Sequence, residues 1–227
     1  MTTSLVDVNT GDSVLHRVLL GAGGHARVLM DALIQTATVV SAVYIPTHEL
    51  LPPWCEKMEP VHSDDQLLLR FPPPTTGLIL GIGSVGDNGK RIRLFEHYNT
   101  LGYSFCPVPH PHRLQASGVR MGEGCQIMAG TILQPGVVLG NNVIINTGAR
   151  IDHDTLIDDH VHIAPGVILS GGVHVERGAH IGTGAVVIQG IRIGAGALVA
   201  AGATVVANVA SGDRVAGVPA RRMTRGQ

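Results

Sequence analysis

A histidine flanked by two aspartates stands in the segment ARIDHD, where Asp154 directly follows His153. The unperturbed pKa of histidine, about 6.5, lies close to working pH, so the imidazole can remove a proton from a reacting group. The Asp154 carboxylate can accept the other imidazole proton and so fix the tautomer. The pair predicts general-base chemistry, although a histidine beside carboxylates is also typical of a solvated turn.

A glycine-rich segment, GAGGHA at residues 21–26, has the spacing of a strand-to-helix turn that binds phosphate. A dinucleotide-binding protein would carry an acidic residue about 20 positions later to hold the ribose. The chain reads SAVYIPTHEL there, and Glu49 comes somewhat late. NAD binding is therefore disfavoured, and the glycine spacing alone is a weak signal.

The first hundred residues alternate apolar runs with amphipathic segments, as expected of an α/β domain that positions such a turn. We expect Val28, Leu29, Ala32 and Leu33 to face inward from the first helix. The proline-rich residues 107–111 break regular structure and predict a linker. Together the segments predict a small Rossmann-like domain, with strands at residues 17–20, 39–45 and 78–82 and helices at residues 25–36 and 90–100.

From Val119 the chain changes to a repeat of six residues, beginning VRMGEG, CQIMAG, TILQPG. Fifteen hexads run to Asn208 without an insertion, and the third position is aliphatic in every one, from Met121 to Val205. The sixth position is glycine in eleven of them, as expected where the chain turns with a positive φ. The other four hexads end in Asn142, Asp154, His160 and Asn208.

A short strand with one inward aliphatic side chain, followed by a turn, forms one face of a prism, and three faces close one coil. Fifteen hexads therefore predict five coils of a parallel β-helix that runs to about residue 212. Its narrow interior fits an aromatic content of 3%. Residues 193–212 carry no charge and have the length of a membrane helix, but they continue the hexads, so we expect no membrane partner.

The charge balance of 17 acidic and 16 basic residues gives a net charge of −1, which argues against recruitment of nucleic acid by bulk electrostatics. The three cysteines have neither disulfide-framework nor zinc-finger spacing, which favours a reducing compartment. Residues 1–12 are polar and do not read as a secretory signal. The cytoplasm is the expected location.

Six segments together resemble the bacterial nucleotide-aminosugar N-acetyltransferases of bacillosamine and perosamine biosynthesis, and the related sialic-acid-operon acetyltransferases. They are LLGAGGHARVL, GIGSVGDNGKR, MAGTILQPG, IINTGARIDHD, HVHIAPGVILSGGV and AGVPAR, and the resemblance covers nearly the whole chain. It implies a hexapeptide-repeat acetyltransferase with a left-handed β-helix, acetyl-CoA as co-substrate, no metal, and a homotrimer with CoA between neighbouring helices. It also implies that residues 1–110 bind a nucleotide sugar and that residues 111–227 form the acetyltransferase β-helix with a short tail.

The same resemblance implies a role for each matched residue. His153 and Asp154 are the expected base and its partner, and the Gly171 amide is expected to polarise the thioester carbonyl. Because Gly171 lies three hexads beyond His153, it should sit one coil above it. Family members carry one or two aspartates after the second strand, where this chain has Pro46, Thr47 and His48. The resemblance therefore does not fix the nucleobase or the sugar of the substrate. The expected cofactor-binding residues are Asn146, Gly171, Gly172, Ala201 and Arg221, and the expected substrate-binding residues are Gly23, Gly24, His25 and His162.

The predicted reaction is acetyl transfer to the amino group of a nucleotide-linked sugar, expected to be a 4-amino-4,6-dideoxy sugar, for surface glycan synthesis. An O-acetyltransferase of a sialic-acid-type sugar would use the same base and donor. A metal-dependent hydratase also remains open, because His162 and His180 are 18 residues apart and should stack on one face. A non-catalytic sugar-nucleotide binding protein is disfavoured by the intact His153–Asp154 pair.

Overall fold

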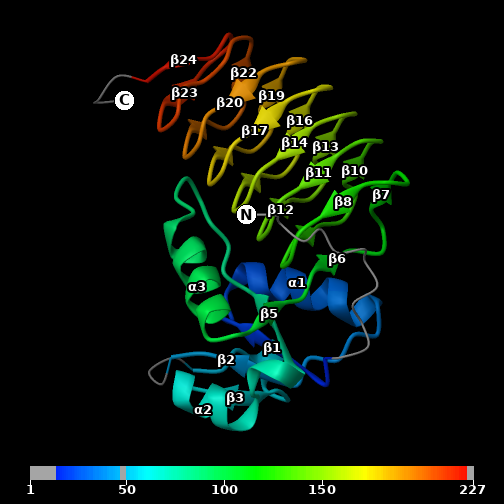
Figure 1. Ribbon diagram of the computed structural model, residues 1–227, viewed down its shortest axis with the longest axis vertical. Helices are drawn as coiled ribbons and strands as arrows, with labels where there is room; N and C mark the ends of the chain where they lie inside the picture. The colour runs from blue at the N-terminus through cyan, green and yellow to red at the C-terminus, as the bar shows by residue number, and fades with distance from the viewer. Residues whose placement is uncertain (1–13, 47–49, 224–227) are drawn as a thin grey trace.

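The computed structural model describes residues 14–46 and 50–223. An N-terminal α/β region lies at one end of a stack of β-coils, and the coils continue to the C-terminal strands (Figure 1). Thr47 and His48, which take the place of the expected aspartates, lie outside the described residues. None of the helices within the described ranges is long and apolar enough to cross a membrane.

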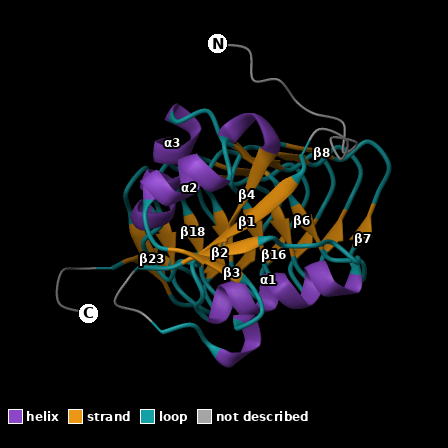
Figure 2. Ribbon diagram, turned by 90° about the horizontal axis from the view of Figure 1, so that it is seen from below, coloured by secondary structure: helices purple, strands orange, loops and turns teal. Residues whose placement is uncertain are grey.

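The N-terminal region is a five-stranded sheet of order β3-β2-β1-β4-β5, and every neighbouring pair of strands is parallel. Figure 2 shows α1 on one face of this sheet and α2 and α3 on the other. The strands are β1 His16–Leu20, β2 Ala42–Tyr44, β3 Glu59–Val61, β4 Thr76–Leu80 and β5 Ser104–Phe105. The helices are α1 Gly24–Gln35, α2 Asp64–Arg70 and α3 Gly89–Thr100, with 3₁₀ turns at Pro53–Cys55 and Pro73–Thr75.

The predicted strands and helices of this region are present, with ends that differ by a few residues. Strands β3 and β5 and helix α2 were not predicted from the sequence. Helix α2 begins with an N-cap residue of a favoured type: the Ser63 hydroxyl accepts a hydrogen bond from the Gln66 backbone N–H. The prediction that Val28 faces inward is wrong, because its side chain is 48% exposed. Leu29, Ala32 and Leu33 are buried, as expected.

The coils of the β-helix stack into three flat sheets, and each strand contributes two or three residues. Sheet 1 contains β7 Leu114–Gln115, β10 Ile132–Leu133, β13 Arg150–Ile151, β16 Ile168–Leu169, β19 Val186–Val187 and β22 Thr204–Val205. Sheet 2 contains β8 Arg120–Met121, β11 Val138–Leu139, β14 Leu156–Ile157, β17 His174–Val175 and β20 Arg192–Ile193. Sheet 3 contains β6 Val108–Pro109, β9 Gln126–Ile127, β12 Ile144–Ile145, β15 His162–Ile163, β18 His180–Ile181, β21 Leu198–Val199, β23 Arg214–Ala216 and β24 Arg221–Arg222.

The register between coils is 18 residues, as in the pairing of Leu133 with Ile151 and of Ile145 with Ile163. All fifteen third-position side chains, from Met121 to Val205, are at most 3% exposed and belong to one hydrophobic core. The predicted ladders of stacked aliphatic side chains are therefore confirmed. The parallel sheets and the repeat fit a left-handed β-helix joined to an N-terminal α/β region.

The turns of the β-helix require a left-handed backbone at the sixth position of the hexads. Asn142, Asp154 and His160 have φ values of 56°, 56° and 62°. Asn208 does not share this conformation; its side-chain oxygen accepts a hydrogen bond from the Arg192 N–H instead. The regular repeat ends at that point.

The prediction of a linker at residues 107–111 is wrong, because strand β6 already belongs to sheet 3 and pairs with β9. Strand β7 likewise pairs with β10. The β-helix thus begins two hexads before Val119. Those two hexads carry Pro109 and Gln115 at the third position, so the aliphatic column did not reveal them.

The α/β region packs against sheet 3 through polar and apolar contacts. The Asn88 side-chain amide donates to the carbonyls of His160, Gly178 and Ala179 at 3.0, 3.1 and 3.2 Å. Met128 of the β-helix packs in the same buried cluster as the inner side chains of α1. These contacts hold the segment between β4 and α3 against the coils.

Candidate active site

His153 lies in the turn after β13, at the corner where sheet 1 passes into sheet 2. Its Nδ1 atom lies 2.9 Å from Oδ2 of Asp154, and its backbone N–H donates to Oδ1 of Asp152 at 2.8 Å. If Nδ1 carries the proton that Asp154 accepts, the lone pair of Nε2 is free to act as a base. The hydrogen bond to Asp154 raises the pKa of His153, with a further contribution from the Asp152 charge.

Gly171 and Gly172 lie in the coil next to His153. The Gly172 N–H donates to the His153 carbonyl at 2.9 Å. A Cβ atom at position 171 would overlap the His153 ring, at 2.6 Å from Cε1. Any residue other than glycine would therefore displace the ring. Gly171 thus lies beside His153 in the next coil, as the spacing of three hexads predicts.

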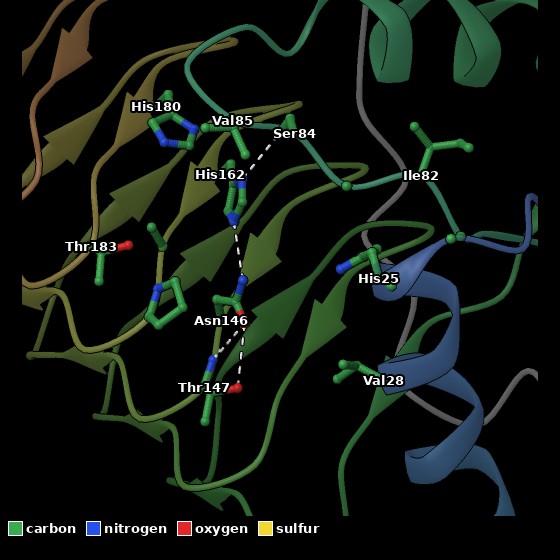
Figure 3. Close-up of a pocket in the computed structure, with 16 residues that line it drawn as sticks. His25, Val28, Ile82, Ser84, Val85, Asn146, Thr147, His162, His180 and Thr183 are labelled. Atoms are coloured by element: carbon green, nitrogen blue, oxygen red, sulfur yellow. Dashed lines mark hydrogen bonds between the residues drawn. The ribbon is translucent and has the colours of Figure 1, made fainter.

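A cavity of about 560 Å³ lies at a different corner, between the α/β region and the turn that joins sheet 3 to sheet 1. Its lining includes five residues that the sequence analysis singled out: Gly23, Gly24, His25, Asn146 and His162. Figure 3 shows His25 and Val28 on α1 facing Asn146, Thr147 and His162 on the coils. His153, Asp154, Gly171 and Gly172 are not among the residues that line this cavity.

One chain of hydrogen bonds crosses the coil side of the cavity. Oδ1 of Asn146 accepts from the Thr147 N–H at 2.8 Å, so its amide nitrogen points the other way, 3.3 Å from Nε2 of His162. Nδ1 of His162 lies 2.9 Å from the Ser84 hydroxyl oxygen (Figure 3). Asn146 and Ser84 thus hold the His162 ring between them.

A second chain ties α1 to the β-helix beneath the cavity. Nε2 of His25 lies 2.7 Å from Oε1 of Gln126, whose amide nitrogen donates to the Leu80 carbonyl at 2.9 Å. The Arg91 guanidinium donates to the carbonyls of Leu80 and Ile82 at 3.0 and 2.7 Å. Sequence reasoning missed Gln126, Arg91 and Ser84 as parts of this site, although Ser84 and Arg91 stand in the GIGSVGDNGKR segment.

The histidines around the cavity are held neutral by their surroundings. Burial lowers the pKa of His25 to about 4. Burial, together with the neighbouring His180, lowers the pKa of His162 to about 3. Burial also lowers the pKa of His180, whose Nδ1 is buried without a hydrogen-bond partner among the described residues.

His162 and His180 lie on one face, as expected. They are paired between β15 and β18, and their rings meet edge to face with centroids 4.8 Å apart. Within residues 14–46 and 50–223, no group of three or more metal-ligating side chains comes together. The three cysteines are free thiols.

Ala201 and Arg221, expected near CoA, lie apart from the cavity lining. Ala201 is an exposed turn residue after β21, and Arg221 is an exposed residue of β24 whose guanidinium donates to its own neighbour's carbonyl, Ala220. Neither position contacts His153 in the hydrogen bonds of the described chain.

Comparison with known proteins places this architecture in a family. Residues 118–153 match the family model of the bacterial transferase hexapeptide (six repeats). No curated protein matches the chain in sequence. Among solved structures, PerB from Caulobacter crescentus in complex with CoA and GDP-perosamine is 33% identical, with a TM-score of 0.81, and the match covers 92% of this chain and 97% of that chain. This chain belongs to the nucleotide-aminosugar N-acetyltransferases of the hexapeptide-repeat superfamily.

Two further solved structures have a similar overall arrangement. The acetyltransferase domain of PglB from Neisseria gonorrhoeae FA1090, in complex with acetyl coenzyme A, is 30% identical, with a TM-score of 0.82 over 92% of this chain and 100% of that chain. WeeI from Acinetobacter baumannii AYE is 26% identical, with a TM-score of 0.73 over 92% of this chain and 99% of that chain. Because each match spans nearly the full length of both chains, the likeness includes the α/β region as well as the β-helix.

Proposed function

We propose that this protein transfers the acetyl group of acetyl-CoA to the amino group of a nucleotide-linked amino sugar. The observation that carries the proposal is the near full-length likeness, at 33% identity, to an enzyme that binds CoA and GDP-perosamine. The cavity between the α/β region and the coils supports it, because its walls combine the first turn of a helix with several uncharged hydrogen-bonding side chains.

His153 is the proposed general base. With Nδ1–H donating to Asp154, its free Nε2 can take a proton from the attacking amine as the amine adds to the thioester carbonyl. The Gly171 amide is the proposed donor to the resulting oxyanion. It lies beside the His153 ring, and among the hydrogen bonds of the described residues none uses the Gly171 N–H. Collapse of the tetrahedral intermediate breaks the C–S bond, and the His153 imidazolium returns its proton to the leaving CoA thiolate.

The α/β region is proposed to be a Rossmann-like nucleotide-sugar-binding domain. Its predicted boundary with the β-helix domain at residue 110 moves towards the N-terminus, because β6 already pairs with β9 in sheet 3. The strand order β3-β2-β1-β4-β5 supports this division of roles. In open parallel sheets, ligands bind beyond the carboxyl ends of the strands. Here β1 leads to Gly23 and Gly24, and β4 leads to the segment 81–85, and both groups line the cavity.

A homotrimer is proposed because one protomer does not bring its own base to its own cavity. Asn146 lies at the corner between sheets 3 and 1, whereas His153 lies at the next corner, between sheets 1 and 2. In a ring of identical subunits, one corner of each copy meets a different corner of the next. Sheet 1 also exposes apolar side chains on its outer face, with Leu114 67% and Ile168 36% exposed.

Acetyl-CoA assays against UDP-, GDP- and dTDP-linked 4-amino sugars test the proposed activity. The expected product is an amide on the sugar nitrogen, identified by mass spectrometry and by its resistance to mild base. A base-labile ester would instead indicate O-acetyl transfer. Failure to acetylate every amino sugar in the panel, while hydroxyl groups of a sialic-acid-type sugar are acetylated, would overturn the N-acetyltransferase assignment. A cytoplasmic location stays a prediction from the sequence.

A further inference from the structure

Ser84 stands at the end of the hydrogen-bond chain that crosses the cavity. The donor and the acceptor of each hydrogen bond in this chain follow from the chemistry of its atoms. Oδ1 of Asn146 accepts from the backbone N–H of Thr147, so the Asn146 NH₂ group faces His162. An amide NH₂ only donates, so Nε2 of His162 must accept. The proton of the neutral imidazole therefore sits on Nδ1.

The Nδ1–H of His162 then donates to the Ser84 oxygen at 2.9 Å. A hydroxyl that accepts one hydrogen bond still carries its own proton to donate. Ser84 lines the cavity, and within the described residues its hydroxyl makes no other hydrogen bond. The chain thus runs in one direction, from Thr147 through Asn146 and His162, and ends in an O–H group that needs an acceptor in the cavity.

The surroundings of Ser84 favour an anionic acceptor. The described cavity lining contains no carboxylate. The fully buried guanidinium of Arg91 donates to the carbonyls of Leu80 and Ile82, just before Ser84, and its Nε and Nη2 have no partner among the described residues. A buried positive charge with no carboxylate beside it raises the affinity of the nearby cavity for negative charge.

The first turn of α1 lies against the same segment. A Cβ atom at Gly83 would be 3.1 Å from Cβ of His25, so the backbone before Ser84 adjoins the start of the helix. Gly23 is the N-cap of the helix, and no side chain of the described part of the chain caps it. The backbone N–H groups of the first turn can therefore bind an anion. His180 adds a buried Nδ1 at the cavity wall that has no hydrogen-bond partner among residues 14–46 and 50–223.

We propose that Ser84 is a ligand-binding residue whose hydroxyl proton, directed by Asn146 and His162, is donated to a phosphate oxygen of the nucleotide diphosphate group. His162 is a positioning residue in this arrangement, because it acts on the ligand through Ser84. The inference rests on the proposed function for the class of ligand. What it adds to the proposed function is a phosphate contact in the segment between β4 and α3.

Calorimetric titration of the full-length protein with GDP, UDP and dTDP tests this assignment. For the diphosphate that the wild-type protein binds, Ser84→Ala is expected to weaken binding roughly ten- to a hundredfold, the usual loss for a hydrogen bond to a charged group. Ser84→Thr keeps a hydroxyl and should restore most of the affinity. Ser104→Ala, at an exposed serine of β5, is the matched control and should bind like wild type.

The positioning role of His162 is tested by a double-mutant cycle. His162→Phe keeps an aromatic ring but removes the N–H that donates to the Ser84 hydroxyl and orients it. Binding of the nucleoside diphosphate should therefore weaken by roughly three- to tenfold. In the Ser84→Ala background the same substitution should have almost no further effect. Full additivity of the two losses would refute the relay and leave His162 with an independent role.

The same preparations are assayed for acetyl transfer, so that failure of the Ser84 assignment can be distinguished from failure of the proposed function. Acetylation of a nucleotide amino sugar with a KM that Ser84→Ala leaves unchanged would overturn the Ser84 assignment and leave the proposed function intact. Diphosphate binding that depends on Ser84, without acetyl transfer to any amino sugar, would overturn the proposed function alone. Absence of binding of all three diphosphates to the wild-type protein would refute the phosphate contact.

Discussion

The backbone of Gly171 lies against the imidazole of His153, and no space remains between them for a side chain. A Cβ atom at position 171 would fall 2.6 Å from Cε1 of the ring. Since the His153 side chain is 54% exposed, the ring can escape by turning outward into solvent. The contact therefore constrains where the imidazole points far more than it constrains folding.

Substitution of Gly171 is accordingly expected to reduce turnover more than stability. We expect Gly171→Ala to lower kcat by at least about tenfold, and Gly171→Val by more, with melting temperatures close to wild type, because a displaced base loses its alignment with the reacting amine. Gly212→Ala is the control: its φ of 72° strains an alanine, but no atom lies near its Cβ. That variant should lose stability and keep its turnover; the reverse pattern would contradict the role given to Gly171.

His153→Asn is expected to lower kcat by roughly 10²- to 10⁴-fold, the usual contribution of a positioned general base, while CoA binding and assembly stay nearly unchanged. Asp154→Asn should lose less, because the base remains but is less well oriented. This second variant keeps the turn, since asparagine tolerates the φ of 56° found at position 154. Near wild-type turnover of His153→Asn with the authentic amino sugar would exclude His153 as the base.

The pH dependence of kcat/KM should report His153. Its pKa is raised, chiefly by the hydrogen bond to Asp154, so the basic form accumulates only above the ordinary histidine value of 6.5. The rate should therefore rise with pH through an ionisation above 6.5, and Asp154→Asn should move that ionisation to lower pH. An unchanged rising limb in His153→Asn would assign it to another group, such as the substrate amine.

Much of the β-helix could be predicted because its strongest constraint is local. Each coil buries one aliphatic side chain per face, so the column from Met121 to Val205 is visible in the sequence. The first two hexads could not be recognised, because Pro109 and Gln115 replace the aliphatic residue there. At those positions the strand pairing of β6 and β7 with the following coil maintains the repeat.

The candidate site was only partly predictable for a related reason. His153, Asp154 and Gly171 belong to neighbouring turns of one repeat, so spacing alone brings them together. Ser84 and Gln126 join the site through contacts with residues 78 and 101 positions away in the chain. Such contacts depend on how the α/β region docks on sheet 3, and no periodicity in the sequence encodes that docking.

Acid is expected to destabilise the fold through its buried histidines. Burial lowers the pKa of His25 and of His160 to about 4, and that of His162 to about 3, from an ordinary value of 6.5. Below pH 6.5 the unfolded chain binds protons that the folded chain does not, so stability is complete above that pH and falls towards pH 4. Each group can cost up to about 1.4 kcal/mol per pH unit in this window.

The measurement is the free energy of unfolding by urea between pH 7.5 and pH 5. His160→Asn removes the one of these three histidines that does not line the cavity, and asparagine accepts the φ of 62° at this turn. The variant should be less stable at pH 7.5, because contacts with Phe95 and Asn142 are lost, but its stability should fall less steeply with acid. A pH-independent free energy of unfolding in the wild type would contradict the buried neutral histidines.

Mixing two inactive variants tests whether the active site is shared between subunits. His153→Asn removes the base, and Gly24→Leu fills the cavity from a position where a Cβ atom meets nothing within 4 Å. If the base of one copy serves the cavity of the next, co-expressed trimers contain intact sites at about a quarter of the interfaces, and a corresponding share of activity returns. If each protomer works alone, no mixture recovers activity. Sedimentation of each variant as a trimer is the control, and a stable, active monomer would refute the shared site.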